Sequence, residues 1–169
     1  IKYIQLSNSI FTLGNSLDVI DSYFGNYITT IDLLGNTQSI KMEFNIVNNY
    51  LYCLSNTKLY VIDPLINALI SVIPLNYEAF DLAINNANGD IYVSYASASV
   101  LSIYNYNNIA YDNLTNLTGY VFGKMVFNDY ESDMYVTTNS TAVLRVDGSN
   151  RTIQATYTVP GLIPSIFYE

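Results

Sequence analysis

Acidic and amide side chains that return at a fixed interval are the first candidates for chemistry in this sequence. Asp21, Asp63, Asn105 and Asp147 follow one another at steps of 42 residues. Carboxylates in register could hold a metal ion, but a calcium loop needs several oxygen ligands at alternate positions, a spacing that this sequence lacks. An Asp or Asn that begins a turn instead accepts hydrogen bonds from backbone N–H groups two residues further along. We therefore expect these residues to be turn-formers, and we expect no metal site.

Catalytic residue types are scarce. Histidine is absent and cysteine occurs once, at Cys53, which removes the usual general base, the Ser-His-Asp arrangement and the common zinc ligands. Carboxylate pairs could still run acid–base chemistry, and the candidates are Glu78 with Asp81 and Glu131 with Asp133. The glycines stand singly in turns, so no phosphate-binding loop is predicted. The sequence thus favours a protein that is not an enzyme and needs no cofactor.

Tyrosine is the abundant aromatic residue, with 17 copies. Most of the rings coincide with predicted strands, where a tyrosine packs its body and keeps its hydroxyl at an edge. Tyr77, Tyr95 and Tyr120 instead lie near predicted connections on one face of the repeat array, and Glu78 adjoins Tyr77. Tyr and Asn side chains on one rigid face suit the recognition of a protein or a glycan. The predicted binding residues are therefore Tyr77, Glu78, Tyr95 and Tyr120.

Short strands in a repeat are the elements that would position these residues. An aromatic column contains Phe11, Tyr52, Tyr92 and Tyr135, and the residue eight positions earlier is Phe44, Ile84 or Phe127 in the last three repeats. Within 79–115, β-branched and aromatic runs are separated by turns that contain Asn and Gly. A repeat of about 40 residues made of strands and turns is typical of β-propeller blades.

The predicted fold is all-β, a β-propeller segment of about four four-stranded antiparallel blades plus the first strand of a fifth. The approximate blades are 1–37, 38–77, 78–120 and 121–162, and 163–169 would open the next. The third strands lack apolar/polar alternation, so both of their faces need cover. The chain begins with Ile, and four blades plus one strand cannot close. We expect a piece of a larger propeller, completed by further blades of the same or another chain.

Composition excludes several classes of partner. The net charge is −8, the isoelectric point is near 4.1 and charged residues make up 12%, so no basic field exists for nucleic acid or an anionic membrane surface. No apolar run is long enough for membrane insertion.

Asn-x-Ser/Thr sequons occur, but they imply glycosylation only in a secretory compartment. These sequons begin at Asn113, Asn116, Asn139 and Asn150.

Three segments carry a resemblance to a known family. Asp133 to Asn139 reads Asp-Met-Tyr-Val-Thr-Thr-Asn, and Asp90 to Ser94 reads Asp-Ile-Tyr-Val-Ser. Val61 to Pro74 contains an Asp-initiated turn with an Asn, followed by an apolar strand that ends in Pro. These segments resemble the YVTN-type β-propeller repeats of surface proteins. The first repeat lacks the Tyr-Val pair and the third has Asn105 in place of the turn Asp. The absence of Trp and His disfavours WD40 repeats, and the absence of a double-Gly motif disfavours kelch repeats.

The resemblance implies a binding platform, since such propellers mostly serve recognition. We expect a structural or recognition module of a surface, extracellular or virion protein, with a protein or glycan partner. The alternative is a propeller hydrolase or lyase with a carboxylate-based site at the channel mouth. That alternative requires carboxylates that converge with a basic residue, such as Lys41 or Lys124, on the first strands of the blades.

Overall fold

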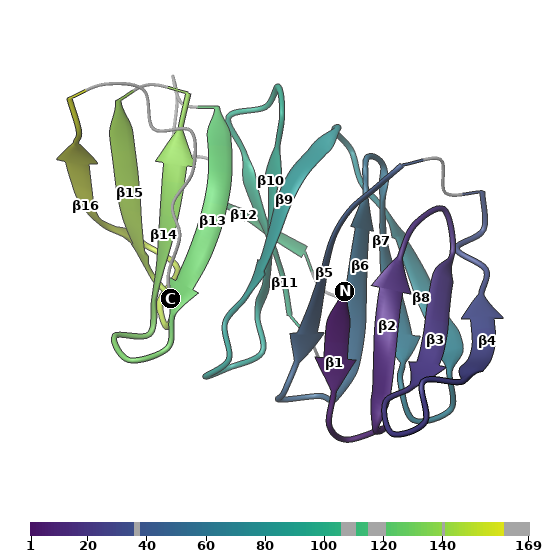
Figure 1. The fold of residues 1–169 in the computed structure, drawn as a ribbon. Helices are drawn as coiled ribbons and strands as arrows, with labels where there is room; N and C mark the ends of the chain where they lie inside the picture. The colour runs from purple at the N-terminus through teal and green to yellow at the C-terminus, as the bar shows by residue number, and fades with distance from the viewer. Residues whose placement is uncertain (36–37, 106–110, 115–120, 140, 161–169) are drawn as a thin grey trace. The chain divides into compact units, whose positions relative to one another are not determined.

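The computed structural model describes residues 1–35, 38–105, 111–114, 121–139 and 141–160 (Figure 1). Every regular element among these residues is a β-strand, and none of them forms a helix that could span a bilayer. The chain divides into two compact units, Ile1–Asn76 and Tyr77–Glu169. We call these unit 1 and unit 2. Each unit contains two four-stranded antiparallel sheets.

Unit 1 holds sheets 1 and 2, in which the strands lie side by side in chain order. Sheet 1 consists of β1 (Lys2–Ile4), β2 (Ser9–Leu13), β3 (Leu17–Asp21) and β4 (Tyr27–Ile31). Sheet 2 consists of β5 (Ser39–Asn45), β6 (Tyr50–Ser55), β7 (Lys58–Asp63) and β8 (Ala68–Pro74).

Unit 2 holds sheets 3 and 4 with the same internal order. Sheet 3 consists of β9 (Ala79–Ile84), β10 (Ile91–Tyr95), β11 (Leu101–Tyr104) and β12 (Tyr111–Leu114). Sheet 4 consists of β13 (Phe122–Asn128), β14 (Asp133–Thr138), β15 (Ala142–Asp147) and β16 (Ile153–Thr158).

The prediction of an all-β chain with four-stranded antiparallel sheets is confirmed. The expected opening strand of a fifth blade, within 163–169, lies outside the described residues. The blade boundaries drawn from the sequence, and the assignment of 1–169 to one segment, stay predictions.

The middle strands of sheets 2 and 3 are largely buried on both faces, whereas β2 and β3 of sheet 1 mix buried and half-buried residues. In β6 every residue except Tyr50 is buried, and all of β10 is buried. Their continuous apolar runs suit strands that are covered on both sides. The last strands β4, β8 and β16 are mostly exposed or half-buried. The core of each unit therefore lies between its two sheets.

Each unit has its own apolar cluster. In unit 1, Phe11, Leu17 and Val19 of sheet 1 join Leu51 and Ile62 of sheet 2, and all of these side chains are fully buried. Burial of each such side chain contributes roughly 1.5–3 kcal/mol.

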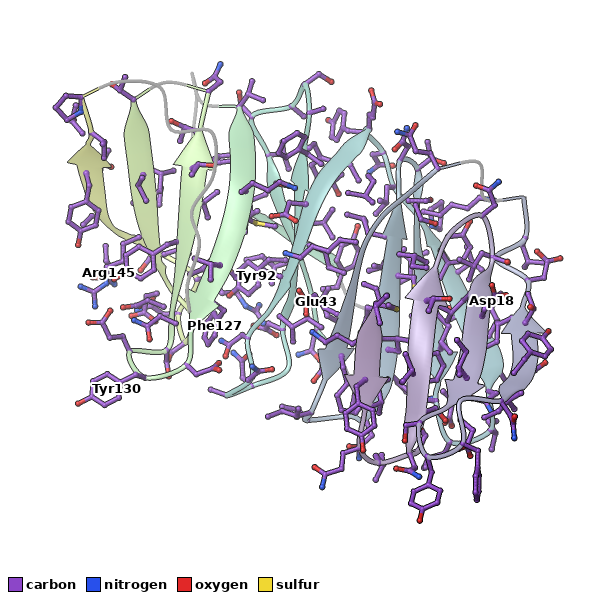
Figure 2. The ribbon with its side chains drawn as sticks, in the orientation of Figure 1. Asp18, Glu43, Tyr92, Phe127, Tyr130 and Arg145 are labelled. Atoms are coloured by element: carbon purple, nitrogen blue, oxygen red, sulfur yellow. The ribbon has the colours of Figure 1, made fainter. Side chains whose placement is uncertain are left out.

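The cluster of unit 2 is built in the same way. It contains Tyr92 and Leu101 of sheet 3 together with Met134 and Val136 of sheet 4. Figure 2 shows the contrast between Tyr92, inside unit 2, and Tyr130, which projects from the β13–β14 turn and is 94% exposed.

A bulge interrupts the first strand of sheets 2, 3 and 4. In β5 the register skips Ile40, and in β9 it skips Phe80, because Asp81 pairs with Ser94 and Ala79 with Tyr95. In β13, Gly123 and Lys124 together face one residue of β14. A bulge bends its strand and re-aims side chains, and bulges are common beside functional sites.

Candidate binding site

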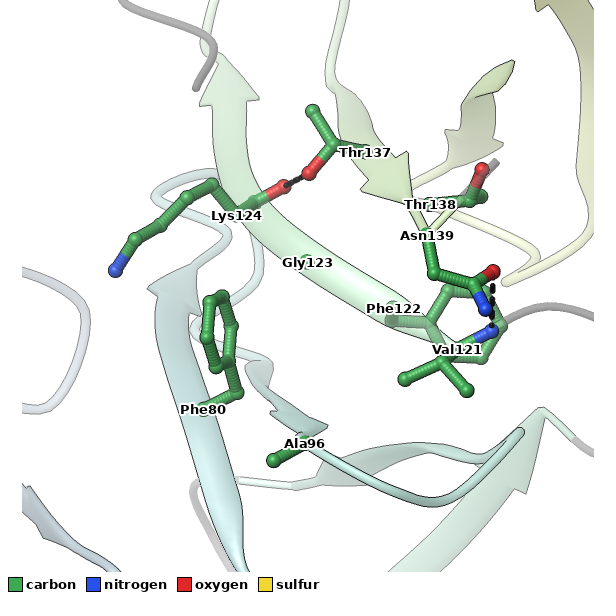
Figure 3. A pocket seen from close by; sticks show the side chains of 9 residues that line it. All are labelled: Phe80, Ala96, Val121, Phe122, Gly123, Lys124, Thr137, Thr138 and Asn139. Atoms are coloured by element: carbon green, nitrogen blue, oxygen red, sulfur yellow. Dashed lines mark hydrogen bonds between the residues drawn. The ribbon is translucent and has the colours of Figure 1, made fainter. Parts of the chain in front are cut away.

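A pocket of about 250 Å³ lies between the two sheets of unit 2, beside the bulges of β9 and β13 (Figure 3). Phe80 of β9 and Lys124 of β13 stand on one side of it. The remaining walls come from the start of β13, the end of β14 and Ala96, which follows β10. The site therefore joins segments of both sheets.

Gly123 allows β13 and β14 to approach closely at the wall of this pocket. A Cβ atom at this position would run into Oγ1 of Thr137 on β14. The hydroxyl of Thr137 donates to the carbonyl oxygen of Lys124 at 3.2 Å, so the bulge and the neighbouring strand are held together. Gly in a strand often marks a bulge or a close approach, and Gly123 does both.

Charges at the pocket are balanced. The Lys124 Nζ atom lies 3.9 Å from Oδ1 of Asp81 and 5.0 Å from the centroid of the Phe80 ring. The Asp81 side chain is 1% exposed, and its Oδ2 accepts a hydrogen bond from the backbone N–H of Met125 at 2.8 Å. A buried carboxylate is stable when it is paired and hydrogen-bonded. Lys124 and Asp81 thus neutralise each other while the amine still reaches solvent.

Asn139 and Val121 form the far wall in Figure 3. The backbone N–H of Val121 donates to Oδ1 of Asn139 at 3.2 Å, and the backbone N–H of Asn139 donates to the carbonyl oxygen of Val121 at 2.8 Å. This double contact fixes the Asn139 side chain at the pocket. Because Oδ1 is engaged with the backbone, the amide NH₂ group is the part left to meet a ligand.

The predicted binding residues Tyr77, Glu78 and Tyr95 lie next to this pocket. The backbone N–H of Ala96 donates to the carbonyl oxygen of Glu78 at 2.9 Å, which brings Glu78 beside a lining residue. The rings of Tyr77 and Tyr95 meet edge to face with centroids 5.4 Å apart. Tyr77 is 45% exposed, whereas Tyr95 is fully buried and its hydroxyl donates to Ser102 Oγ at 2.7 Å. Tyr120 lies outside the described residues.

The predicted turn residues lie at strand ends. Oδ1 of Asp21 accepts from the N–H groups of Tyr23 and Phe24 at 2.8 and 2.7 Å, and Oδ1 of Asp63 accepts from Leu65 at 2.8 Å. Asn105 directly follows β11.

Asp147 binds the backbone in the same way as Asp21 and Asp63. Its Oδ1 accepts from the N–H groups of Ser149 at 2.7 Å and Asn150 at 3.1 Å. The N–H groups of Asn150 and Ser149 favour the ionised carboxylate and lower the pKa of Asp147.

The two carboxylate pairs proposed from the sequence are engaged separately. Glu78 is exposed while Asp81 is buried. Glu131 accepts the hydroxyl of Tyr135 at 2.8 Å, and Asp133 accepts Nε of Arg145 at 2.6 Å. Within the part of the chain that the structure describes, no three His, Cys, Asp or Glu side chains are grouped to hold a metal ion.

A polar network joins the two sheets at the other end of β9. Asn85 and Asn88 donate to the carbonyl oxygen of Gly148 at 2.9 and 3.0 Å. Arg151 binds Asp90 with two nitrogens, Nε to Oδ2 at 3.0 Å and Nη2 to Oδ1 at 3.1 Å. Such a bidentate pair fixes the relative orientation of the two side chains and also pairs their charges. The two sheets of unit 2 are therefore joined at this end by Asn85, Asn88 and Arg151. At the pocket they are joined by the contacts of Asp81 with Met125 and Lys124.

Phe80 and Gly123 are site residues that the sequence analysis missed. Phe80 reads as an ordinary first-strand residue, and only the pairing of β9 with β10 shows that it is skipped. Gly123 offered a signal, since an isolated glycine in a strand pattern suggests a bulge. Cys53 is buried in unit 1, and burial raises the pKa of its thiol, so it offers no nucleophile.

Comparisons with known proteins define a fold without a family. No protein-family model matches the sequence, and no curated protein matches it. Among solved structures 607 chains match, so the likeness is widely shared and singles out no function. One is dihydro-heme d1 dehydrogenase NirN in complex with DHE, with a TM-score of 0.72 and 11% identity. The match covers 94% of this chain and 37% of the NirN chain, so this chain spans well under half of that protein. The protein described here is thus an all-β chain, and its four-stranded sheets match part of a β-propeller protein.

Proposed function

We propose that this chain is a non-enzymatic recognition module of a surface, extracellular or virion protein, and that it binds a protein or glycan through the pocket at Phe80 and Lys124. The observation that carries the proposal is the pair of bulges that face this pocket. Phe80 is unpaired in β9, and Gly123 with Lys124 forms the bulge of β13. Rigid strands that present an aromatic ring and an amine beside a bulge make a preformed site.

The finer assignment to YVTN-type repeats is part of the proposal. Its support is that the Tyr-Val pairs of the two segments that resemble the motif occupy equivalent places. Tyr92-Val93 lies in β10 and Tyr135-Val136 in β14, each the second strand of its sheet. A surface, extracellular or virion setting is supported by the acidic, charge-poor composition and by this resemblance.

Burial of Asp81 supports binding over catalysis. The hydrolase or lyase alternative requires a carboxylate and a lysine that converge on first strands, and Asp81 of β9 and Lys124 of β13 do converge. A general acid or base must reach the proton that it transfers. Asp81 is 1% exposed and is held by the N–H of Met125. Its carboxylate is therefore placed to position Lys124 rather than to contact a substrate.

The test is an NMR titration of the isotope-labelled chain with three panels of small probes: neutral sugars, acidic sugars and uncharged tetrapeptides. At least one panel should shift the amide signals of Gly123, Lys124 and Thr137. Phe80→Ala should abolish the shifts, because Phe80 is the exposed ring of the pocket, at 39%. Phe24→Ala is the matched control, since Phe24 is an exposed ring of unit 1, at 72%.

Two outcomes would overturn the proposal. If no panel shifts the pocket signals, the pocket is not the recognition site. If disaccharide or peptide probes are cleaved during the titration and Lys124→Ala stops the cleavage, the chain is an enzyme.

A further inference from the structure

We infer that the pocket of unit 2 binds a neutral sugar ring. This inference rests on the proposed function, because it names the ligand class of the same site.

The size of the pocket limits the ligand. Its volume of about 250 Å³ lies just below the range of about 300–1,000 Å³ that is usual for drug-sized ligands. A single six-membered ring with its substituents is of suitable size. Larger partners would have to place one ring or one side chain in the pocket and leave the rest outside.

The balance of charge favours a neutral ligand. An anionic ligand would have to draw Lys124 away from Asp81, 3.9 Å from its amine. It would also approach a chain with a net charge of −8, which weakens its encounter with the site. A cationic ligand would meet the Lys124 amine, which is repulsive at short range. The pocket as a whole offers no uncompensated charge.

The hydrogen-bonding groups favour hydroxyls. Asn139 presents its NH₂ group and Lys124 its ammonium group, and both are donors. The hydroxyl group of Thr137 donates its proton to the carbonyl oxygen of Lys124, so its Oγ1 atom can act toward a ligand only as an acceptor. A sugar hydroxyl both donates and accepts, so neighbouring hydroxyls on one ring can meet both kinds of group. An apolar ligand would bury these groups without partners, which is costly.

The exposed ring completes the match. The π face of Phe80 is electron-rich, and polarised C–H groups on one side of a sugar ring pack well against such a face. Lys124 lies over the ring at 5.0 Å and holds its orientation. A sugar would thus have an apolar contact on Phe80 and, across the pocket from it in Figure 3, polar contacts at Thr137 and Asn139.

The experiment is a quantitative titration of the whole chain with D-glucose, D-galactose, D-mannose and N-acetyl-D-glucosamine, followed by NMR. At least one should bind at the pocket with a dissociation constant on the order of 1–10 mM, as expected for a ligand of about twelve heavy atoms. Phe80→Ala should weaken binding by at least about tenfold, and Phe80→Tyr should retain it, because the ring is kept.

Thr137→Val gives a second check, because it removes the acceptor with little change of shape, together with the hydrogen bond to the carbonyl oxygen of Lys124. It should weaken binding about three- to tenfold. Lys41→Ala is a control in unit 1, since Lys41 lies in β5 and does not line the pocket of unit 2, so this variant should bind as the natural chain does. Unchanged amide signals in the sheets will show that each variant is folded.

The comparison panels separate the possible failures. If tetrapeptides shift the pocket signals and no neutral sugar does, the sugar inference is wrong and the recognition role stands. If glucuronic acid binds more tightly than glucose, the argument from charge is wrong and the ligand is anionic. If no probe of any class binds, the inference and the proposed function both fail.

Discussion

The two units carry a lysine at the same place, yet its surroundings differ. Lys41 lies three residues before Phe44 in β5, and Lys124 lies three residues before Phe127 in β13. Lys41 pairs with Glu43 of its own strand at 3.6 Å, whereas Lys124 reaches Asp81 of the neighbouring sheet. The bulge beside Lys41 contains Ile40 where the other contains Gly123. The scaffold therefore repeats, and unit 1 also has a pocket at this place, of about 290 Å³ beside Ser39 to Met42. The residues that break the repeat change what lines the pocket of unit 2.

The turn ends of the first strands show a second difference. In unit 1, Tyr3, Leu6, Phe44 and Ile46 line an open groove of about 580 Å³. In unit 2 the corresponding region is joined by polar contacts, among them Asn85 to Gly148. Satisfied polar networks fix one arrangement of neighbouring elements, whereas apolar contacts are less directional. Unit 2 should accordingly depend on single polar residues more than unit 1 does.

Loss of one arginine gives the largest expected effect. Arg151→Ala would leave Asp90, with a side chain 3% exposed, without its charge partner. Removing one member of a buried pair costs about 3–5 kcal/mol, and we expect about 3 because Arg151 itself is 29% exposed. Lys2→Ala in unit 1 removes a partly exposed partner of Glu43 and should cost less than about 1 kcal/mol. Urea unfolding measures both. Equal losses of stability in the two variants would contradict the expectation that unit 2 depends more on single polar residues than unit 1 does.

The substitution Gly148→Ala tests how tightly the residues around Gly148 are packed. In Gly148→Ala the new Cβ would meet the carbonyl oxygen of Ser132, and Asn85 Nδ2 at 2.7 Å. Because the N–H of Gly148 also holds that carbonyl oxygen, the strain cannot relax cheaply. We expect a loss of about 2 kcal/mol in the free energy of unfolding. Gly14→Ala in unit 1 would meet only Ser16 O at 3.9 Å and should be nearly neutral. A tolerated Gly148→Ala would show that the network is loose.

A tyrosine hydroxyl gives a smaller contrast. Tyr95→Phe removes a buried hydrogen bond of 2.7 Å to Ser102 and should lower the free energy of unfolding by about 1 kcal/mol. Tyr3→Phe in unit 1 removes an exposed contact of 3.4 Å to Asn8 and should change stability very little. Thermal unfolding of the two variants measures the difference. A harmless Tyr95→Phe would show that this buried hydrogen bond contributes little to stability.

The sheets could be predicted because their signal is local and repeated. Tyr52, Tyr92 and Tyr135 all lie in second strands, β6, β10 and β14. The expected first strand of the third repeat, 80–84, lies within β9.

The pocket could not be predicted because it depends on pairing between strands. The pairing of β9 with β10 skips Phe80, and no residue type in the sequence indicates such a skip. Asp81 and Lys124 lie more than 40 positions apart in the sequence but close together in the fold. Tyr95 was expected at the surface because it adjoins a connection. Its hydroxyl instead found a partner in Ser102 inside sheet 3. The hydroxyl group of a buried tyrosine usually finds such a partner.

The turn carboxylates are the feature that the two units share, and their effect should be small. The pKa of Asp147 is lowered by the N–H groups of Asn150 and Ser149. A depressed folded pKa contributes stability above the unfolded value of about 3.9, and this contribution is lost as pH falls through the folded pKa. The stability gap between the natural chain and Asp147→Asn should therefore be present at pH 6 and should shrink as the pH falls below the unfolded value of about 3.9. Carboxyl NMR titration and urea unfolding across this pH range measure it. Asp21→Asn, in the matching turn of unit 1, should lower stability by a similar small amount at pH 6. A gap for Asp147 that stays constant with pH would show that its backbone hydrogen bonds do not depend on the charge.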